Sequence, residues 1–150
     1  MTQFKSLFNV GFEFFDAEGS AMTDPNSYLA ATPLDMVRQF SRIMDTPLDR
    51  EYRQNSAIDR LRLRLLQEEF DEVCAAEDDE NLLKELADLA YVTFLYAATF
   101  GWDLDEAIRR VHASNMSKLG PDGKPVYRDD GKVLKGKNYQ APDLSDLVCD

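Results

Sequence analysis

Five acidic side chains stand where a helical pattern normally places apolar residues: Glu68, Glu69, Glu72, Glu85 and Asp88. Two carboxylates about 5 Å apart repel by roughly 3 kcal/mol at an effective dielectric constant of about 20. Buried acids therefore need protons, arginine partners or a bound cation. Oxygen ligands on facing helices suit Mg²⁺, with Mn²⁺ as the alternative ion, and such ions keep waters that a phosphate can displace. This pattern predicts a divalent-metal site that binds a phosphate compound.

Two predicted helices position these acids. On the first, residues 58–76, Glu68, Glu69 and Glu72 continue an apolar stripe at 3.6 residues per turn. The second is apolar nearly all round from residue 86 to residue 100, which predicts burial by its own chain or by a partner subunit. The short linker over residues 76–81 makes the two helices antiparallel, which brings Glu72 and Glu85 near the same end.

The acidic motifs resemble those of a known superfamily. Glu68-Glu69-Phe70-Asp71-Glu72 and Glu85-Leu86-Ala87-Asp88 fit the EExxE and ExxD pair of the all-α nucleotide pyrophosphohydrolases. That superfamily includes MazG, the dimeric dUTPases and phosphoribosyl-ATP pyrophosphohydrolase. The resemblance continues through residues 111–118 and 132–143, covers residues 34–144, and is greatest for the MazG-like, dUTPase-like branch.

The resemblance implies Mg²⁺-dependent hydrolysis of a nucleoside triphosphate to a monophosphate and pyrophosphate, by a homodimer or homotetramer. Glu69, Glu72, Glu85 and Asp88 are the expected metal ligands. Glu68, on the edge of the same face, is the expected base for the attacking water. The expected substrate contacts are Asn115, Lys118, Lys135 and Tyr139. We expect dUTP first, then dCTP or a modified nucleotide. Phosphoribosyl-ATP ranks lower, because the Asn115 helix and the tail resemble the dUTPase-like branch better.

Other interpretations of the same residues stay open. Arg62 or Arg64 would neutralise the acids without a metal, Asn115 would serve as a helix C-cap, and Lys118 would be a surface lysine. The chain as a whole would then be a non-catalytic helical oligomerisation module with a structural cation. A di-iron carboxylate bundle is set aside, because it supplies Glu-x-x-His pairs and Arg109 stands three residues before His112.

Composition limits the function classes. A net charge of −11 argues against a nucleic-acid polymer as partner, because phosphate backbones need a basic face. The apolar helix is too short to span a membrane. Cys74 and Cys149 do not make a disulfide framework, so both are expected to be reduced and the protein cytoplasmic.

The expected fold is an all-α antiparallel bundle of four to five helices in one domain of 150 residues. An aromatic N-terminal arm (residues 1–31) precedes a helical core (32–119), and a short β-hairpin and extended tail follow (120–150). Helix starts are predicted at Thr32–Pro33, Ser56 and Asp103 from their capping residues. The hairpin is predicted around Asp129–Gly131.

Overall fold

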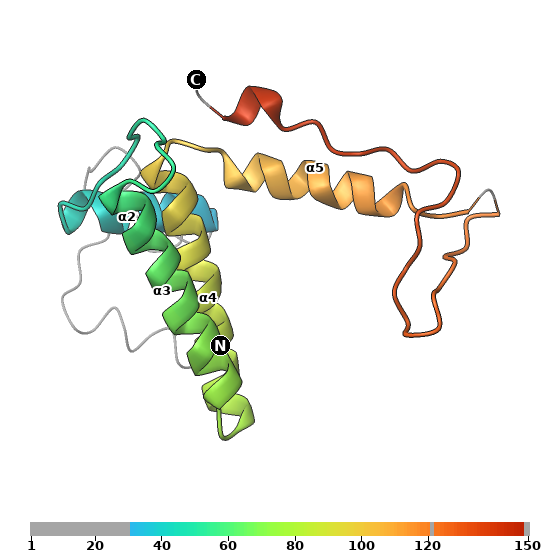
Figure 1. Ribbon diagram of the computed structural model, residues 1–150, viewed down its shortest axis with the longest axis horizontal. Coiled ribbons are helices and arrows are strands. Elements are labelled where there is room, and N and C mark those ends of the chain that lie inside the picture. The colour runs from blue at the N-terminus through green and yellow to red at the C-terminus, as the bar shows by residue number, and fades with distance from the viewer. Residues whose placement is uncertain (1–30, 121, 149–150) are drawn as a thin grey trace. The chain divides into compact units, whose positions relative to one another are not determined.

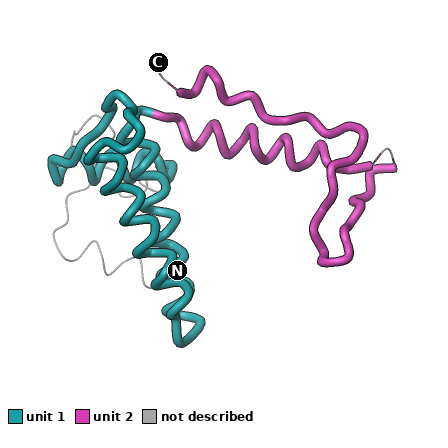
Figure 2. The backbone as a smooth tube through the Cα atoms, in the orientation of Figure 1, with its two compact units in different colours: residues 1–101 teal, residues 102–150 magenta. Residues whose placement is uncertain are grey.

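The computed structural model describes residues 31–120 and 122–148. The predicted N-terminal arm up to residue 30 and the prediction for Cys149 lie outside the described residues. The described chain is all-α, as expected: four α-helices and a short 3₁₀ helix make up its named elements (Figure 1). It divides into two compact units, residues 1–101 and residues 102–150 (Figure 2), which are described separately. The single-domain boundaries stay a prediction.

Helix α2 (Pro33–Ile43) begins at the predicted capping residues. The Thr32 hydroxyl accepts from the Asp35 backbone N–H at 3.2 Å, and the Asp35 carboxylate accepts from the Thr32 N–H at 3.0 Å. This reciprocal capping box satisfies two backbone donors that a helix start leaves without partners.

Helices α3 (Ala57–Ala75) and α4 (Asp79–Thr99) form the antiparallel pair that carries the acids (Figure 1). The predicted start of α3 is confirmed, since the Ser56 hydroxyl accepts from the Asp59 N–H. The predicted linker over residues 76–81 is too long, because α4 begins at Asp79. Asp78 caps it by accepting from the Asn81 N–H at 2.8 Å. The extra turn makes Asn81 part of the helix, one turn before Glu85.

The core of the first unit lies where α2 and the end of α4 pack together. Its fully or nearly fully buried apolar residues are Leu34, Val37, Phe94, Leu95, Ala97, Ala98 and Phe100. Burial of α4 is therefore confirmed for its C-terminal half. At the start of the predicted segment Leu86 is 46% exposed, and Leu83, one turn before it, is 70% exposed. Burial of this end by a partner subunit, the alternative given above, stays a prediction. On α3, the apolar residues Leu61, Leu63 and Phe70 follow the helical spacing of an apolar stripe, but they too are exposed.

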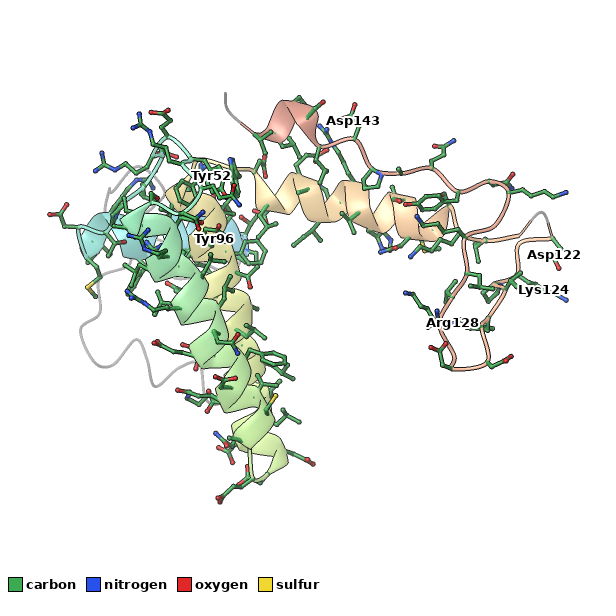
Figure 3. All side chains as sticks on the ribbon, viewed as in Figure 1. Tyr52, Tyr96, Asp122, Lys124, Arg128 and Asp143 are labelled. Carbon is green, nitrogen blue, oxygen red and sulfur yellow. The ribbon has the colours of Figure 1, made fainter. Side chains whose placement is uncertain are left out.

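Two charged residues of α3 occupy the core instead, and the helical pattern did not predict them. Asp59 is 1% exposed and accepts from the Tyr96 hydroxyl at 2.6 Å and from the Asn55 N–H at 2.7 Å. Arg62 is 4% exposed and donates through Nε to the Thr99 hydroxyl at 2.8 Å. These bonds tie the start of α3 to the end of α4, near the place where Figure 3 labels Tyr52 and Tyr96.

The second unit consists of α5 (Leu104–Met116), a hairpin-like turn and the tail with its 3₁₀ helix (Ser145–Leu147). Asp103 caps α5 as predicted, by accepting from the Glu106 N–H. The predicted hairpin is present only as a single antiparallel bridge between Tyr127 and Val133, and residues 122–148 contain no named strand. Arg110 fastens the tail to α5 through the Asp143 carbonyl and the Asp146 carboxylate.

Among the residues that the structure describes, no helix is both long and apolar enough to cross a bilayer.

Candidate metal centre

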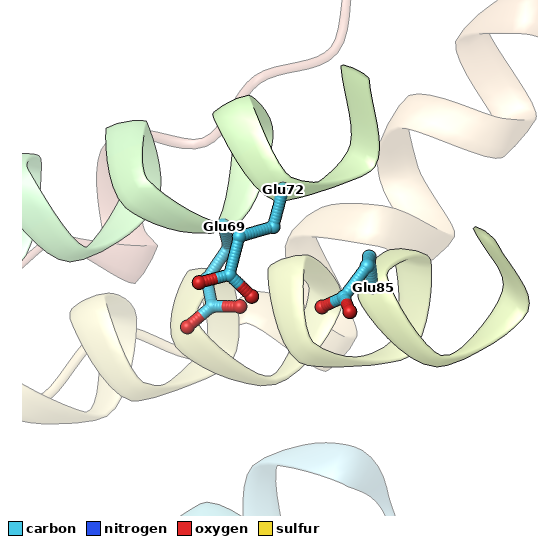
Figure 4. Close-up of side chains that lie close together, drawn as sticks. All are labelled: Glu69, Glu72 and Glu85. Carbon is cyan, nitrogen blue, oxygen red and sulfur yellow. The ribbon is translucent and has the colours of Figure 1, made fainter. Parts of the chain in front are cut away.

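Three of the predicted metal ligands converge between α3 and α4. Glu69 and Glu72 extend from α3, one turn apart on the same face, toward Glu85 on α4 (Figure 4). One carboxylate oxygen from each lies within 4.8 Å of the others. The antiparallel pairing of the helices produces this meeting, so the predicted proximity of Glu72 and Glu85 is confirmed.

The donor set fits a hard divalent cation. Mg²⁺ binds oxygen at about 2.0–2.1 Å in an octahedron, so its ligand oxygens lie roughly 3 to 4 Å apart. Oxygens within 4.8 Å reach such separations through small side-chain rotations. Three carboxylates leave room in the octahedron for waters or phosphate oxygens. The glutamate triad could therefore hold a metal ion of this class.

The electrostatics of the triad show how strongly its carboxylates interact. A hydrogen bond to Glu85, together with the charges of Glu85 and Glu69, raises the pKa of Glu72 above its ordinary value. In contrast, the hydrogen bond from the Lys84 ammonium lowers the pKa of Glu85. Glu72 thus holds a proton more readily than an isolated glutamate, whereas Glu85 ionises more readily than one.

Lys84 is the cation that the sequence analysis did not identify. Its Nζ lies 3.0 and 2.9 Å from the two oxygens of Glu85, and 3.0 Å from Oδ2 of Asp88. The Asn81 amide also donates to Glu85 Oε1 at 2.7 Å. Arginine was the neutralising residue considered, but Arg62 is bonded to Thr99. The signal was present in the sequence: Lys84 and Asp88 have the i,i+4 spacing of a helical ion pair.

The two remaining acids of the predicted site, Asp88 and Glu68, lie outside the triad. Asp88 is paired with Lys84 and is not part of the triad, so its role as a ligand stays a prediction. Glu68 is exposed on α3, next to Glu69, and its role as a base is likewise a prediction.

The predicted substrate contacts all lie in the second unit. Lys135 Nζ lies 4.2 Å from the centre of the Tyr139 ring. The nearby polar groups of Ser114 and Lys135, with the positive charge of Lys118 as a smaller contribution, lower the pKa of Tyr139. The sequence-predicted Lys118, Lys135 and Tyr139 are therefore neighbours, whereas Asn115 is an exposed residue of α5.

Serine side chains of α5 hold the tail at this place. The Ser114 hydroxyl donates to the Gln140 carbonyl at 2.6 Å, and the Gln140 N–H donates to the Ser117 hydroxyl at 2.8 Å. Gly136 passes so close to the end of α5 that a Cβ there would lie 2.9 Å from the Lys118 carbonyl oxygen. The sequence analysis did not identify either serine as a tail contact.

Comparison with known families decides the relationship. Residues 37–115, more than half of the chain, match the family model described as phosphoribosyl-ATP pyrophosphohydrolase. The chain belongs to this family. The family is part of the all-α, MazG-like nucleotide pyrophosphohydrolase superfamily, so the resemblance drawn from the acidic motifs is confirmed. The match contains α3, α4 and all five predicted acids, and it ends at Asn115. A search of curated proteins gave no match to this chain.

Proposed function

We propose that the protein is a divalent-metal-dependent pyrophosphohydrolase of a nucleoside triphosphate, releasing a monophosphate and pyrophosphate. The observation that carries the proposal is the convergence of Glu69, Glu72 and Glu85 within 4.8 Å, inside the segment that matches the family. Without a bound cation, such a cluster would destabilise the folded protein, because like charges repel at this distance.

The proposed roles follow from placement. Glu69, Glu72 and Glu85 would hold the ion, with Asp88 as a fourth ligand once it is free of Lys84. A divalent ion bound there would neutralise charge on the phosphates. Glu68, beside Glu69 and open to solvent, would orient the attacking water and take its proton. The water oxygen then bonds to phosphorus while the phosphoanhydride bond between the α- and β-phosphates breaks, which yields the monophosphate and pyrophosphate.

Phosphoribosyl-ATP is the first substrate to test, because the matched family is described by its hydrolysis. The deoxynucleotides dUTP and dCTP form the second group, with modified nucleotides. Lys118, Lys135 and Tyr139, the expected substrate contacts, lie beyond the matched residues 37–115. The resemblance of this region to the dUTPase-like branch is the reason to expect nucleotide contacts there. Both groups share the same bond cleavage and the same metal requirement.

A substrate panel tests the proposal. The protein is incubated with Mg²⁺ and phosphoribosyl-ATP, dUTP, dCTP or the common nucleoside triphosphates, and pyrophosphate is measured. We expect release from at least one compound, lost on chelation and restored by Mg²⁺ or Mn²⁺. Glu69→Gln is the inactive control, because it keeps the shape of the side chain and removes its charge.

The alternative function, a non-catalytic oligomerisation module with a structural cation, predicts a different outcome. Pyrophosphate would appear from no compound of the panel, although the protein would still bind the metal. That result would contradict the proposed hydrolase activity and leave the metal centre itself intact.

A further inference from the structure

Glu85 has little unused hydrogen-bonding capacity for a metal ion. Its Oε1 accepts from the Asn81 amide at 2.7 Å and from Lys84 Nζ at 3.0 Å, and its Oε2 accepts from Lys84 Nζ at 2.9 Å. A carboxylate offers about four lone-pair sites, and both oxygens of Glu85 already accept from a cation. A second cation that bonds to these oxygens would meet the positive charge of Lys84 at close range, so it has to displace that partner.

Of these partners, Lys84 is the one that can leave at least cost. Its side chain is 61% exposed, whereas that of Glu85 is 6% exposed. A lysine ammonium on a flexible stem is well hydrated when it turns to solvent. Glu85, in contrast, is held in place by its burial and by Asn81.

Lys84 also forms an ion pair with Asp88, the predicted ligand that lies outside the triad. The Nζ that donates to both oxygens of Glu85 also lies 3.0 Å from Asp88 Oδ2. One ammonium group thus neutralises both acids of the Glu85-x-x-Asp88 motif, and the departure of Lys84 would release both together.

We infer that Lys84 is the internal counter-ion of the metal-free centre, and that a divalent cation displaces it from Glu85 and Asp88. Lys84 stabilises the folded protein without metal, and it weakens metal binding because the two cations compete for the same oxygens. Once displaced, the ammonium is a mobile positive charge beside the proposed phosphate site. Lys84 is on this account a positioning residue. The inference rests on the proposed metal-dependent function.

The test compares wild type with Lys84→Met and with Arg64→Met. Methionine keeps the length and apolar stem of lysine. Arg64 is an exposed cation of α3 that forms no ion pair with any residue in ranges 31–120 and 122–148, so Arg64→Met controls for a general loss of positive charge. Calorimetric titration with Mn²⁺ alone gives the metal affinity, and thermal unfolding gives the melting temperature with and without Mn²⁺.

We expect Lys84→Met to bind Mn²⁺ more tightly by roughly three- to tenfold, the scale of the partly exposed ion pairs that the metal no longer has to break. Its melting temperature without metal should fall, and the rise on adding Mn²⁺ should exceed that of wild type. Arg64→Met should match wild type in both measurements. Equal Mn²⁺ affinity in Lys84→Met and Arg64→Met would overturn the inference.

A measurement on the wild type keeps the test valid if Lys84→Met does not fold. The side-chain ¹⁵N signal of the Lys84 ammonium is followed by NMR during titration with Mg²⁺. We expect a saturable shift toward the value of a solvated lysine, at the concentrations that saturate metal binding. A signal unchanged at metal saturation would overturn the inference while leaving pyrophosphate release, and hence the proposed function, untouched. A protein that binds no metal in any form would overturn both.

Discussion

The carboxyl groups of Glu72 of α3 and Glu85 of α4 meet across the helix pair, with one oxygen of each within 4.8 Å of the other (Figure 4). This proximity raises the pKa of Glu72 above its ordinary value of 4.5, whereas Lys84 lowers that of Glu85. The folded protein therefore holds the Glu72 proton more tightly than the unfolded chain does. The resulting stability is fully present below Glu72's unfolded pKa and is lost as pH rises through its raised pKa. The pKa of Glu85 is lowered, so its contribution to stability is present above pH 4.5 and is lost as the pH falls below that value.

The first prediction concerns pH. Without metal, the melting temperature of wild type should fall relative to Glu72→Gln as pH rises from about 4.5 toward neutrality. Saturating Mg²⁺ should remove this difference in slope, because the ion binds the deprotonated carboxylate and relieves the repulsion. Metal affinity should accordingly weaken as pH falls through the same window. Parallel pH profiles for wild type and Glu72→Gln without metal would contradict the prediction.

The second prediction separates catalysis from stability. Glu69→Ala should lower pyrophosphate release by at least roughly 10–100-fold, since loss of a hydrogen-bonding partner of a ligand already has that effect. Its metal-free melting temperature should be equal to or above that of wild type, because one of three mutually repelling charges is gone. Asp71→Ala, a change at an exposed acid of α3 outside the triad, is the control and should leave both quantities unchanged. Full Mg²⁺-dependent activity of Glu69→Ala would remove Glu69 from the ligand set.

The third prediction concerns the buried bond between Tyr96 and Asp59. Tyr96→Phe removes the hydroxyl donor and leaves a carboxylate that is 1% exposed with one partner fewer. The free energy of unfolding should fall by about 1–3 kcal/mol, measured by urea denaturation. In the double variant with Asp59→Asn the effect of Tyr96→Phe should be smaller, because the buried charge is gone. Additive effects would show that the hydroxyl contributes through other contacts.

The buried polar pair also explains where sequence reasoning reached its limit. The helices with capping residues were predicted nearly to the residue, since those signals are local: Thr32 with Asp35, and Ser56 with Asp59. The meeting of Glu72 and Glu85 followed from a short linker between two long helices. The burial of Asp59 and Arg62 depends on Tyr96 and Thr99, both 37 residues away in the sequence. No periodicity within α3 contains that information.

The same reasoning applies to residues that the pattern assigned to a core. Leu63 and Phe70 have the spacing of a buried stripe, yet they are 47% and 51% exposed. Periodicity indicates which side chains seek an apolar partner, and it does not say whether that partner belongs to the same chain. Lys84 was missed for a related reason, because lysine on a helix is normally a solvated residue.

The fourth prediction concerns the oligomer expected from sequence. Leu83 and Leu86 lie one turn apart on α4 and are 70% and 46% exposed, in the N-terminal half of the helix that also carries Lys84 and the acids. Contiguous exposed apolar side chains of this size indicate an interaction surface. Analytical ultracentrifugation should show wild type as a dimer or tetramer and Leu83→Glu as a smaller species. Glu80→Gln, a change at an exposed residue of the same helix, should leave the mass unchanged. A monomeric wild type would contradict the prediction.

The fifth prediction concerns the tail of the second unit. Gly136→Ala would place a Cβ 2.9 Å from the Lys118 carbonyl oxygen and 3.1 Å from that of Leu119. Backbone atoms cannot move aside as a flexible side chain can, so the tail should shift and lose its bonds to Ser114 and Ser117. We expect faster amide hydrogen exchange at Gln140, whose N–H donates to Ser117.

If Lys135 and Tyr139 contact the nucleotide, the KM for the substrate should rise while kcat changes little, because the acids on α3 and α4 are not altered. Lys124→Ala, a change at an exposed residue of the same unit, is the control for a substitution in this part of the chain. An unchanged KM together with faster exchange at Gln140 would show that the tail is held against α5 for a reason other than substrate binding.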